Sequence, residues 1–335
     1  MQSFQRRHLQ EHGMIAIRSR LSAIAVFGLA LSAAAGAQPY PQRPVKLVTA
    51  VVAGSTGDIV ARAVAERLSS SLKQAFVVEN RPGAGGNIGA ELVAKAPADG
   101  HTLLVSIGST LTVNPNIYKK MPFDPAADLR PISIMTTSST MLVVHPSMPV
   151  NSAAEFVTFA RNHPIGYATG GNGTPSHLGM EYFGLQAGFR ATPVPYRGNA
   201  PLVTDLVAGQ IMVSFPAIGS VIAHVRDGRL RALAVSGETR SPIAPEVPRM
   251  TELGYPDFKI ATQMVLSAPA AIPDGVAVVL EREVRQALRS PGLAEKLRAH
   301  GYEIAATTGA EAKSRLQDER RLWADVIKAA GIHVN

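Results

Sequence analysis

Two glycine-containing segments combine residue types and spacings that could bind an anion. In the first, residues 54–58 read Gly-Ser-Thr-Gly-Asp and lie between an apolar, β-prone run at 45–52 and a helical pattern. Glycines let backbone N–H groups turn toward one point, and the positive end of the following helix adds to the attraction for an anion. We therefore predict that Ser55, Thr56 and Asp58 contact an anionic ligand. The alternative is that Thr56 or Asp58 only caps the helix.

In the second segment, residues 170–177 read Gly-Gly-Asn-Gly-Thr-Pro-Ser-His. Thr174 is predicted to be an N-cap, because the proline that follows it suits the first position of a helix. The helix start would then offer N–H groups, together with the hydroxyls of Thr174 and Ser176, to a carboxylate. Gly173 and His177 complete this part of the predicted site. For His177 the alternative is local packing or local hydrogen bonding.

A third set of residues follows the ends of two predicted strands. In open α/β sheets, ligands bind beyond the carboxyl ends of the strands. Ser109 and Thr110 follow one strand in this way, and Pro216, Ala217 and Ile218 follow another. All five are therefore predicted to line the ligand site.

The sequence contains none of the familiar catalytic or metal-binding patterns. Gly-x-Ser-x-Gly and His-Glu-x-x-His are both absent, and there is no cysteine. The glycines at 83–89 are not followed by Gly-Lys-Ser/Thr, so they are interpreted as a tight structural turn and not as a phosphate site. We predict no catalytic residue, no metal and no cofactor.

The elements that position these residues alternate along the chain. Short β-prone runs alternate with helical patterns, which predicts α/β layers around largely parallel sheets. Two helices are expected at the C-terminal end, one carrying Leu280, Val284 and Leu288 and the other Leu316 and Trp323. The strands are expected at 45–52, 76–79, 102–107, 132–145, 165–169, 192–196, 211–215, 230–236 and 264–268.

The N-terminal segment has the order of a secretory signal. Arg18 and Arg20 precede an apolar run at 21–35, and residues 35–37 read Ala-Gly-Ala, a small-residue cleavage site. The run is shorter than the roughly 20 residues that cross a bilayer. We predict that residues 1–37 are a cleaved signal peptide and that the protein is periplasmic.

Composition excludes several classes of partner. The 335-residue chain is 46% hydrophobic and 17% charged, which is enough apolar material for a large core. The absence of cysteine rules out a lipid-modified cysteine anchor, so we expect a protein that is not membrane-anchored. We also expect a monomer. A net charge of +8 could steer anionic solutes. Basic residues are scattered and aromatic residues are 5%, so no nucleic-acid partner is predicted.

Many short motifs, in order along nearly the whole mature chain, resemble one family. They match the substrate-binding proteins of tripartite tricarboxylate transporters, also called the Bug receptors. The matching stretches include Tyr-Pro-Gln-Arg-Pro-Val at 40–45, Glu-Asn-Arg-Pro-Gly-Ala-Gly-Gly at 79–86, Pro-Ala-Asp-Gly-His-Thr at 97–102, Gly-Thr-Pro-Ser-His-Leu at 173–178, Val-Pro-Tyr-Arg-Gly at 194–198 and Asp-Leu-Val-Ala-Gly at 205–209.

The resemblance implies a type II-like periplasmic binding protein, in which two α/β lobes joined by two crossing strands close like a Venus flytrap. The first lobe would comprise residues 38–143 plus 263–335, and the second residues 144–262. The crossings would lie at about 138–144 and 262–268. Such receptors bind small carboxylates in the cleft and deliver them to the membrane permease of a tripartite tricarboxylate transporter.

Three departures from the family pattern bear on the ligand. Members usually read Pro-Phe-x-Pro-Gly-Gly before the aspartate, whereas Ala-Val-Val-Ala stands here at 50–53 and Ser55 replaces the second glycine. Pro216 stands where an Asp or Asn is usual, and Met264, included in the predicted site, stands where an aromatic residue is usual. The changes at Pro216 and Met264 suggest a ligand that is less polar than an amino acid, or shaped differently.

Two other functions are compatible with parts of this pattern. The same receptor could be a sensor that presents its closed form to a membrane signalling protein. A periplasmic hydrolase on an α/β scaffold is the third hypothesis, which the missing catalytic motifs disfavour.

Overall fold

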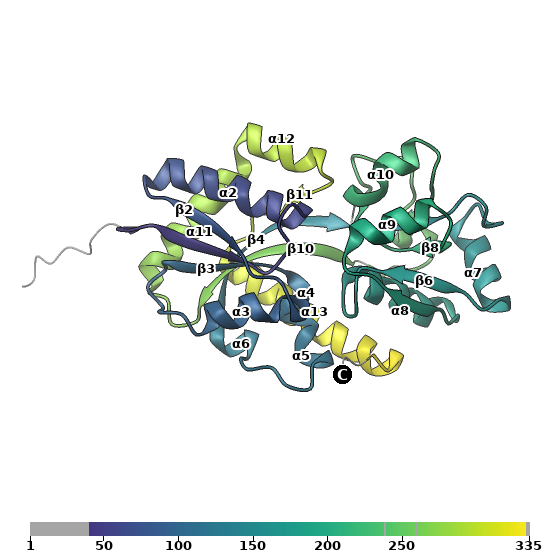
Figure 1. Ribbon diagram of the computed structural model, residues 1–335, viewed down its shortest axis with the longest axis horizontal. Coiled ribbons are helices and arrows are strands. Elements are labelled where there is room, and N and C mark those ends of the chain that lie inside the picture. The colour runs from purple at the N-terminus through teal and green to yellow at the C-terminus, as the bar shows by residue number, and fades with distance from the viewer. Residues whose placement is uncertain (1–39, 238, 259, 333–335) are drawn as a thin grey trace, which may run out of the picture. The chain divides into compact units, whose positions relative to one another are not determined.

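A computed structural model describes residues 40–237, 239–258 and 260–332, apart from the side chain of Thr56 (Figure 1). The predicted signal peptide lies outside the described residues. The chain divides into the unit Met1–Gln42 and the compact unit Arg43–Asn335, and the fold below is that of the second unit.

The first lobe is built on a six-stranded sheet. Strands β1, β2 and β3 are parallel, because β1 pairs with β2 on one side and β3 on the other, whereas β10 runs antiparallel to β3 and β4. In order across the sheet the strands are β11 (Glu303–Ile304), β4 (Leu129–Ser139), β10 (Ala261–Pro269), β3 (Thr102–Ile107), β1 (Val45–Thr49) and β2 (Phe76–Asn80). Its helices are α2 (Thr56–Leu72), η1 (Ala84–Gly86), α3 (Asn87–Ala94), α4 (Gly108–Thr112), α5 (Asn114–Ile117), α6 (Pro125–Asp128), α11 (Asp274–Arg289), α12 (Pro291–Ala299) and α13 (Gly309–Ala330).

The second lobe is built on a five-stranded sheet. Here β6 is parallel to β7 and β8, and β5 is antiparallel to β8 and β9. The order is β7 (Thr192–Pro195), β6 (Gly166–Thr169), β8 (Val213–Ser214), β5 (Met141–Val144) and β9 (Arg231–Val235). Its helices are α7 (Ala153–Asn162), α8 (Pro175–Ala187), α9 (Asn199–Val207), α10 (Ile218–Arg226) and η2 (Met250–Leu253).

The two sheets are joined where β4 leads into β5 and where the chain returns along β10. A single residue, Thr140, separates β4 from β5. The buried Ser236 ties the two passages together, because its hydroxyl accepts a hydrogen bond from the Thr140 amide at 2.9 Å and donates to the carbonyl of Ile260. These contacts fix the two connections side by side. The predicted lobe boundaries themselves stay a prediction.

The buried clusters of the chain differ in composition. A cluster in the first lobe is largely aliphatic and includes Val48, Leu104 and Val265, and so is a cluster of the second lobe that includes Val221. Another cluster, centred on the second lobe, also contains aromatic rings: Phe183 meets the ring of Phe189 edge-on, with 5.2 Å between the ring centroids. Burial of this apolar surface is the main stabilising contribution in both lobes.

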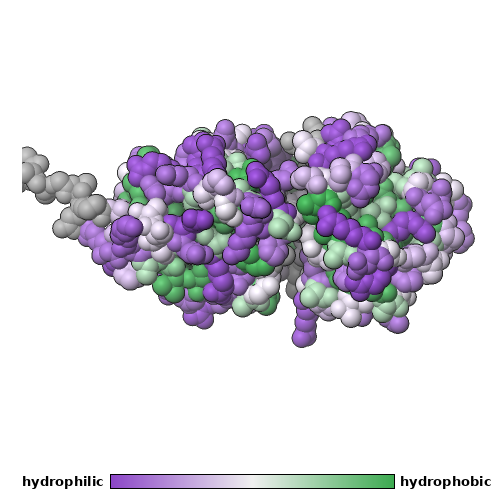
Figure 2. All heavy atoms as spheres, turned by 90° about the horizontal axis from the view of Figure 1, so that it is seen from above, coloured by the Kyte–Doolittle hydropathy of each residue, from purple (hydrophilic) through white to green (hydrophobic). Residues whose placement is uncertain are grey.

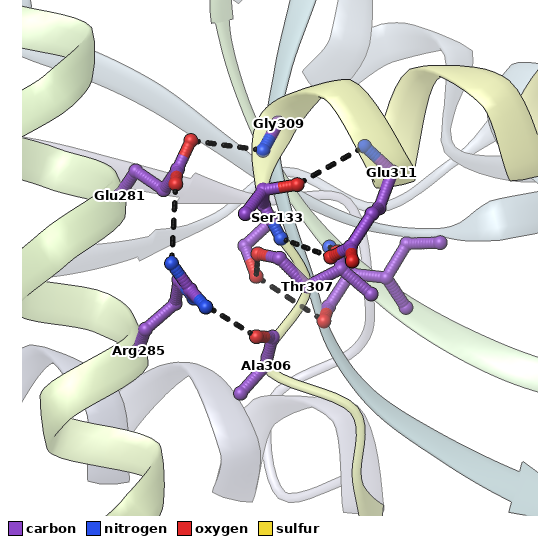
Figure 3. A network of polar contacts seen from close by, with 9 residues as sticks. Ser133, Glu281, Arg285, Ala306, Thr307, Gly309 and Glu311 are labelled. Carbon is purple, nitrogen blue, oxygen red and sulfur yellow. Dashed lines mark hydrogen bonds and ion pairs between the residues drawn. The ribbon is translucent and has the colours of Figure 1, made fainter.

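Helix α13 connects the lobes at its two ends. Its start is held in the first lobe by a polar network, in which Glu281 and Arg285 of α11 point toward the segment before α13 (Figure 3). Glu281 accepts from the Gly309 amide at 2.9 Å, and Arg285 donates to the carbonyl of Ala306 at 3.2 Å. Farther along the helix, Trp323 belongs to the aromatic cluster of the second lobe.

The predicted elements are present with changed limits. The run predicted as one strand at 132–145 is divided at Thr140 between the two sheets, which a continuous β-prone pattern cannot reveal. The structure also has α12 between the two expected C-terminal helices. Within the part of the chain that the structure describes, no helix has both the length and the apolar character needed to span a bilayer. Polar side chains cover much of the face seen in Figure 2.

Candidate functional site

All three sets of predicted site residues follow strands, at the carboxyl ends where the chain turns into helices. In the first lobe, β1 leads to α2 and β3 leads to α4. In the second lobe, β6 leads to α8 and β8 leads to α10. Because β1 is parallel to β3 and β6 is parallel to β8, each lobe has a pair of helix starts at one edge of its sheet.

In the first segment, Ser55 and Asp58 make hydrogen bonds within the loop. Ser55 is the N-cap of α2, and its hydroxyl accepts from the Asp58 amide at 3.3 Å. Neither Thr56 nor Asp58 is the cap, and the side chain of Thr56 lies outside the described residues. The buried Asp58 carboxylate accepts from the Gly54 amide at 2.9 Å, from Arg62 Nε at 2.8 Å and from Asn80 Nδ2 at 2.9 Å.

These bonds determine the charge of Asp58. Burial on its own would raise the pKa of this carboxyl, but the hydrogen bonds from Arg62, Gly54 and Asn80 outweigh burial and hold the pKa below its ordinary value. Asn80 also donates to the carbonyl of Val51 at 3.1 Å. Asp58 is therefore an ionised anchor that holds the loop between β1 and α2.

In the second segment, a chain of hydroxyl bonds closes the loop on itself. The Gly170 amide donates to the hydroxyl of the buried Ser176 at 2.9 Å, and the hydroxyls of Ser176 and Thr174 are 3.0 Å apart. The Thr174 hydroxyl donates to the carbonyl of Gly171 at 2.7 Å. Thr174 holds the N-cap position of α8, with proline next to it as predicted, but its side chain does not cap the helix. Pro175 has no N–H, and the amides of His177 and Leu178 each donate to the carbonyl of Thr174 at 3.0 Å, so the backbone and no side chain accepts from this turn.

His177 completes the closure of this loop. Its Nδ1 accepts from the Gly173 amide at 3.1 Å, and its side chain is buried. Burial lowers the pKa of His177 to about 4, so the ring is neutral at pH 7. The geometry matches the local-bonding alternative stated for this residue.

The third set lies in several different environments. The hydroxyl of the buried Thr110 donates to the carbonyl of Gly85 at 3.0 Å, which holds the glycine-rich turn. Ile218 packs in the core of the second lobe. Met264 is also buried, and a Cβ atom added to Gly57 of α2 would lie 3.1 Å from its Cε.

Pro216 and Ala217 lie where the second lobe begins α10. The carbonyl of the buried Pro216 accepts from the Met141 amide at 2.8 Å. Ala217 pairs with Thr140 in an isolated β-bridge and is the N-cap of α10. Both residues therefore hold the second lobe against the first connection between the sheets.

One cavity, of about 10 Å³, lies between elements of the two lobes. Of the predicted residues, Ser109 lines it, next to Pro175 at the start of α8. The structure thus brings together one residue of the first lobe and the helix that follows the second segment, while Ser55 and Asp58 are not among the lining residues. The remaining lining residues are Ile107, Gly108, Thr112, Val113, Leu178, Ile260, Ala261, Gln263, Glu319 and Trp323.

Sequence reasoning missed Gln263 and Glu319. Glu319 stands in the strongly charged run Gln-Asp-Glu-Arg-Arg at 317–321, which is typical of a solvated helix face. A possible signal was its spacing of four residues from Trp323, which places both on the same side of a helix. Among the described residues, no group of three or more His, Cys, Asp or Glu side chains could hold a metal ion.

Two glycines mark close contacts between the lobes. A Cβ atom at Gly173 in the second lobe would lie 2.4 Å from Cδ1 of Ile117 in the first. A Cβ atom at Gly219 of α10 would lie 2.2 Å from the carbonyl oxygen of His300, which follows α12. A side chain at Gly219 would overlap backbone, whereas one at Gly173 would require the Ile117 side chain to shift.

Two α/β lobes, joined by two passages of the chain and enclosing a small cavity between them, define a two-lobed solute-binding protein. The family model described as "Tripartite tricarboxylate transporter family receptor" matches residues 60–332. The chain belongs to this family, which confirms the resemblance seen in the sequence, the two-lobed fold and the prediction of a binding receptor in place of an enzyme.

Relatives and solved structures agree with this assignment. Protein BugT of Bordetella pertussis is 34% identical over 316 residues, covering 92% of this chain and 97% of its own. The structure "R. palustris Rpa4515 with adipate" is 33% identical with a TM-score of 0.81, covering 88% of this chain and 99% of the other. MatC of Rhodopseudomonas palustris, solved with bound malate, is 27% identical with a TM-score of 0.76, covering 86% and 100%.

Proposed function

We propose that the protein is a periplasmic receptor that captures a small carboxylate between its lobes and delivers it to the membrane permease of a tripartite tricarboxylate transporter. The observation that carries the proposal is that Ser109 of the first lobe and Pro175 of the second line one cavity. Family membership supports the receptor role. The adipate and malate named with the two solved relatives support a carboxylate ligand.

The second loop supplies the chemistry that suits an anion. In the first turn of α8 the amide of Ser176 has no hydrogen-bond acceptor among the described residues, and the N-terminal end of a helix attracts negative charge. The side chains of Ser176, Thr174 and His177 hold the loop so that this amide keeps its direction. Their proposed role is therefore to position backbone donors, with their own hydroxyls adding contacts where the ligand reaches them.

Capture and closure are linked in this proposal. A ligand bonded to both lobes stabilises the closed arrangement over the open one by its difference in affinity for the two. Charge-assisted hydrogen bonds contribute roughly 1.5–3 kcal/mol each, so four of them, after ordering costs, give a dissociation constant on the order of micromolar. The lobe boundaries at 143/144 and 262/263 and cleavage after residue 37 are part of the proposal.

Titration calorimetry of the mature protein tests the proposal. The panel consists of malate and the straight-chain dicarboxylates of four to eight carbons, adipate among them. At least one acid should bind with a dissociation constant on the order of micromolar. Ser109→Ala and Ser176→Ala should each weaken that binding by about tenfold, because Ser109 lines the cavity and Ser176 holds the loop at the start of α8.

Thr204→Ala is the matched control, since Thr204 is an exposed residue of α9 whose hydroxyl donates to the carbonyl of Ala200 at 3.1 Å. Its affinity should equal that of the unmodified protein. Unchanged affinity in both serine variants would place the ligand elsewhere, and no binding of any acid would reject carboxylate capture. Delivery is tested separately, by asking whether liganded protein, but not empty protein, co-purifies with a solubilised permease.

A further inference from the structure

An amide and a carboxyl side chain form a pair at the wall of the interlobe cavity. Gln263 lies on β10 and Glu319 on α13, and Gln263 Nε2 donates to Glu319 Oε1. Gln263 is only 7% exposed, and its Oε1 has no hydrogen-bond partner among the described residues. A buried amide oxygen without a hydrogen-bond donor destabilises the fold, so a bound group that donates to Gln263 Oε1 would be stabilised there.

The Gln263–Glu319 pair lies among uncharged residues, which favours the neutral form of the Glu319 carboxyl. The other lining residues are apolar, carry hydroxyls or, at Trp323, carry a neutral indole N–H, so Glu319 is the one ionisable side chain among the described residues that line the cavity. Burial raises the pKa of Glu319 to about 8, against the opposing charge of Arg315 one helical turn earlier. At pH 7 the carboxyl is therefore mostly protonated and can donate, while Gln263 Oε1 can only accept.

The size of the cavity limits what can occupy this position. Its volume of about 10 Å³ is close to the minimum for one water molecule. A hydroxyl adds a single heavy atom and is both donor and acceptor, which complements the pair. A carboxylate adds three heavy atoms, would place a negative charge next to Glu319, and could not donate to Gln263.

We propose that Gln263 and Glu319 bind a hydroxyl group of the captured ligand, so that the substrate class is a hydroxycarboxylate whose carboxylate lies outside the cavity. This inference rests on the proposed function, because it names the ligand of the same site. The hydroxyl donates to Gln263 Oε1 and accepts from the Glu319 carboxyl. The apolar Leu178, Ile260 and Trp323 enclose the adjoining carbons.

Calorimetry at pH 7 with matched probes tests the inference. For each chain length from four to eight carbons, the ω-hydroxy acid is compared with the unsubstituted monocarboxylate and the dicarboxylate. At the length that fits, the hydroxy acid should bind at least about tenfold more tightly than both. Gln263→Leu should abolish this preference. Glu319→Gln should retain it, because the new amide can still donate.

Asp318→Asn is the control, because Asp318 lies next to Glu319 on α13 but has a side chain 70% exposed, and it should change nothing. If Gln263→Leu does not fold, the pH dependence of binding tests the inference instead. The preference for the hydroxy acid should weaken between pH 7 and 9 in the unmodified protein, because Glu319 loses its proton there, and should not weaken in Glu319→Gln. Equal binding of acids with and without the hydroxyl would mean that the cavity holds only water, which overturns the inference and leaves carboxylate capture intact. If none of the acids binds, carboxylate capture falls as well.

Discussion

The loops of residues 50–58 and 170–177 have the same order of elements and use opposite chemistry. Each follows a buried strand, contains at least one glycine with positive φ and leads into a helix. The first loop is held by an ionised carboxylate, because Asp58 bonds Gly54, Arg62 and Asn80. The second is held by neutral groups, the hydroxyls of Thr174 and Ser176 and the imidazole of His177.

The difference teaches where an anion can be accommodated. The negative charge that fixes the first loop is paired with Arg62 Nε at 2.8 Å, so the start of α2 lies beside an ion pair, whereas the groups that fix the second loop place no charge beside the start of α8. The loops also differ in what they touch. Gly173 lies against Ile117 of the other lobe, while a Cβ atom at Gly54 would meet nothing within 4 Å. The second loop is thus the one whose fit depends on the arrangement of the lobes.

The largest expected effect is the loss of stability on replacing Gly173 by alanine, compared with the same replacement at Gly54. Both have positive φ, 73° at Gly173 and 78° at Gly54, so alanine strains the backbone at either position by about 1–2 kcal/mol. Gly173→Ala also overlaps Ile117 and should lower the free energy of unfolding by about 3–4 kcal/mol in total, measured by urea denaturation. Gly54→Ala is the control for strain alone. Equal losses would show that the interlobe contact does not constrain the second loop.

The neutral His177 of the second loop and the ionised Asp58 of the first should affect stability at different pH values. His177 takes up a proton at pH 6.5 when unfolded but only at about pH 4 when folded. The unfolded state therefore binds more protons in this window, and stability should fall by up to about 3 kcal/mol as the pH falls from 6.5 to 4. Asp58, whose pKa is lowered, affects stability only at lower pH. Its contribution to the free energy of unfolding is fully present above the ordinary pKa of about 4 and is lost as the pH falls below that value.

Denaturation curves between pH 4 and 8 measure this order. His177→Asn should flatten the upper window, because an amide oxygen can accept from Gly173 without titrating. His163→Asn, at an exposed histidine after α7, is the matched control and should leave the slope unchanged. A slope that survives in His177→Asn would assign the acid sensitivity to other groups.

The smallest effect concerns the anchor of the first loop. Asp58→Asn removes the negative charge that accepts from Arg62 and Gly54, and should cost about 1–2 kcal/mol at pH 7, since the geometry can be kept while the charge assistance is lost. Glu66→Gln, at an exposed position of the same helix, should cost nothing measurable. Thermal denaturation of the two variants side by side gives the difference. A neutral Asp58→Asn would mean that hydrogen bonding without charge is sufficient for this loop.

Much of the scaffold could be predicted from local pattern. The helix that carries Leu280, Val284 and Leu288 is present as α11, with these side chains buried. Proline at the start of α8 and the alternation of strands and helices were equally visible, because capping and periodicity are properties of neighbouring residues. The division of residues 132–145 between two sheets was not visible, because pairing partners far away in the chain decide it.

The sequence by itself determined the family, the two-lobed α/β class and the two glycine-rich turns at the strand ends, since these depend on residue order and local backbone preference. Only the tertiary structure decided what each polar side chain does. Asp58, Ser176 and His177 bond their own loops, and Glu319, in a run that resembles a solvated helix face, reaches the cavity beside Gln263. The physical reason is that burial, which sets both hydrogen-bond partners and pKa, arises from elements that are brought together only when both lobes pack.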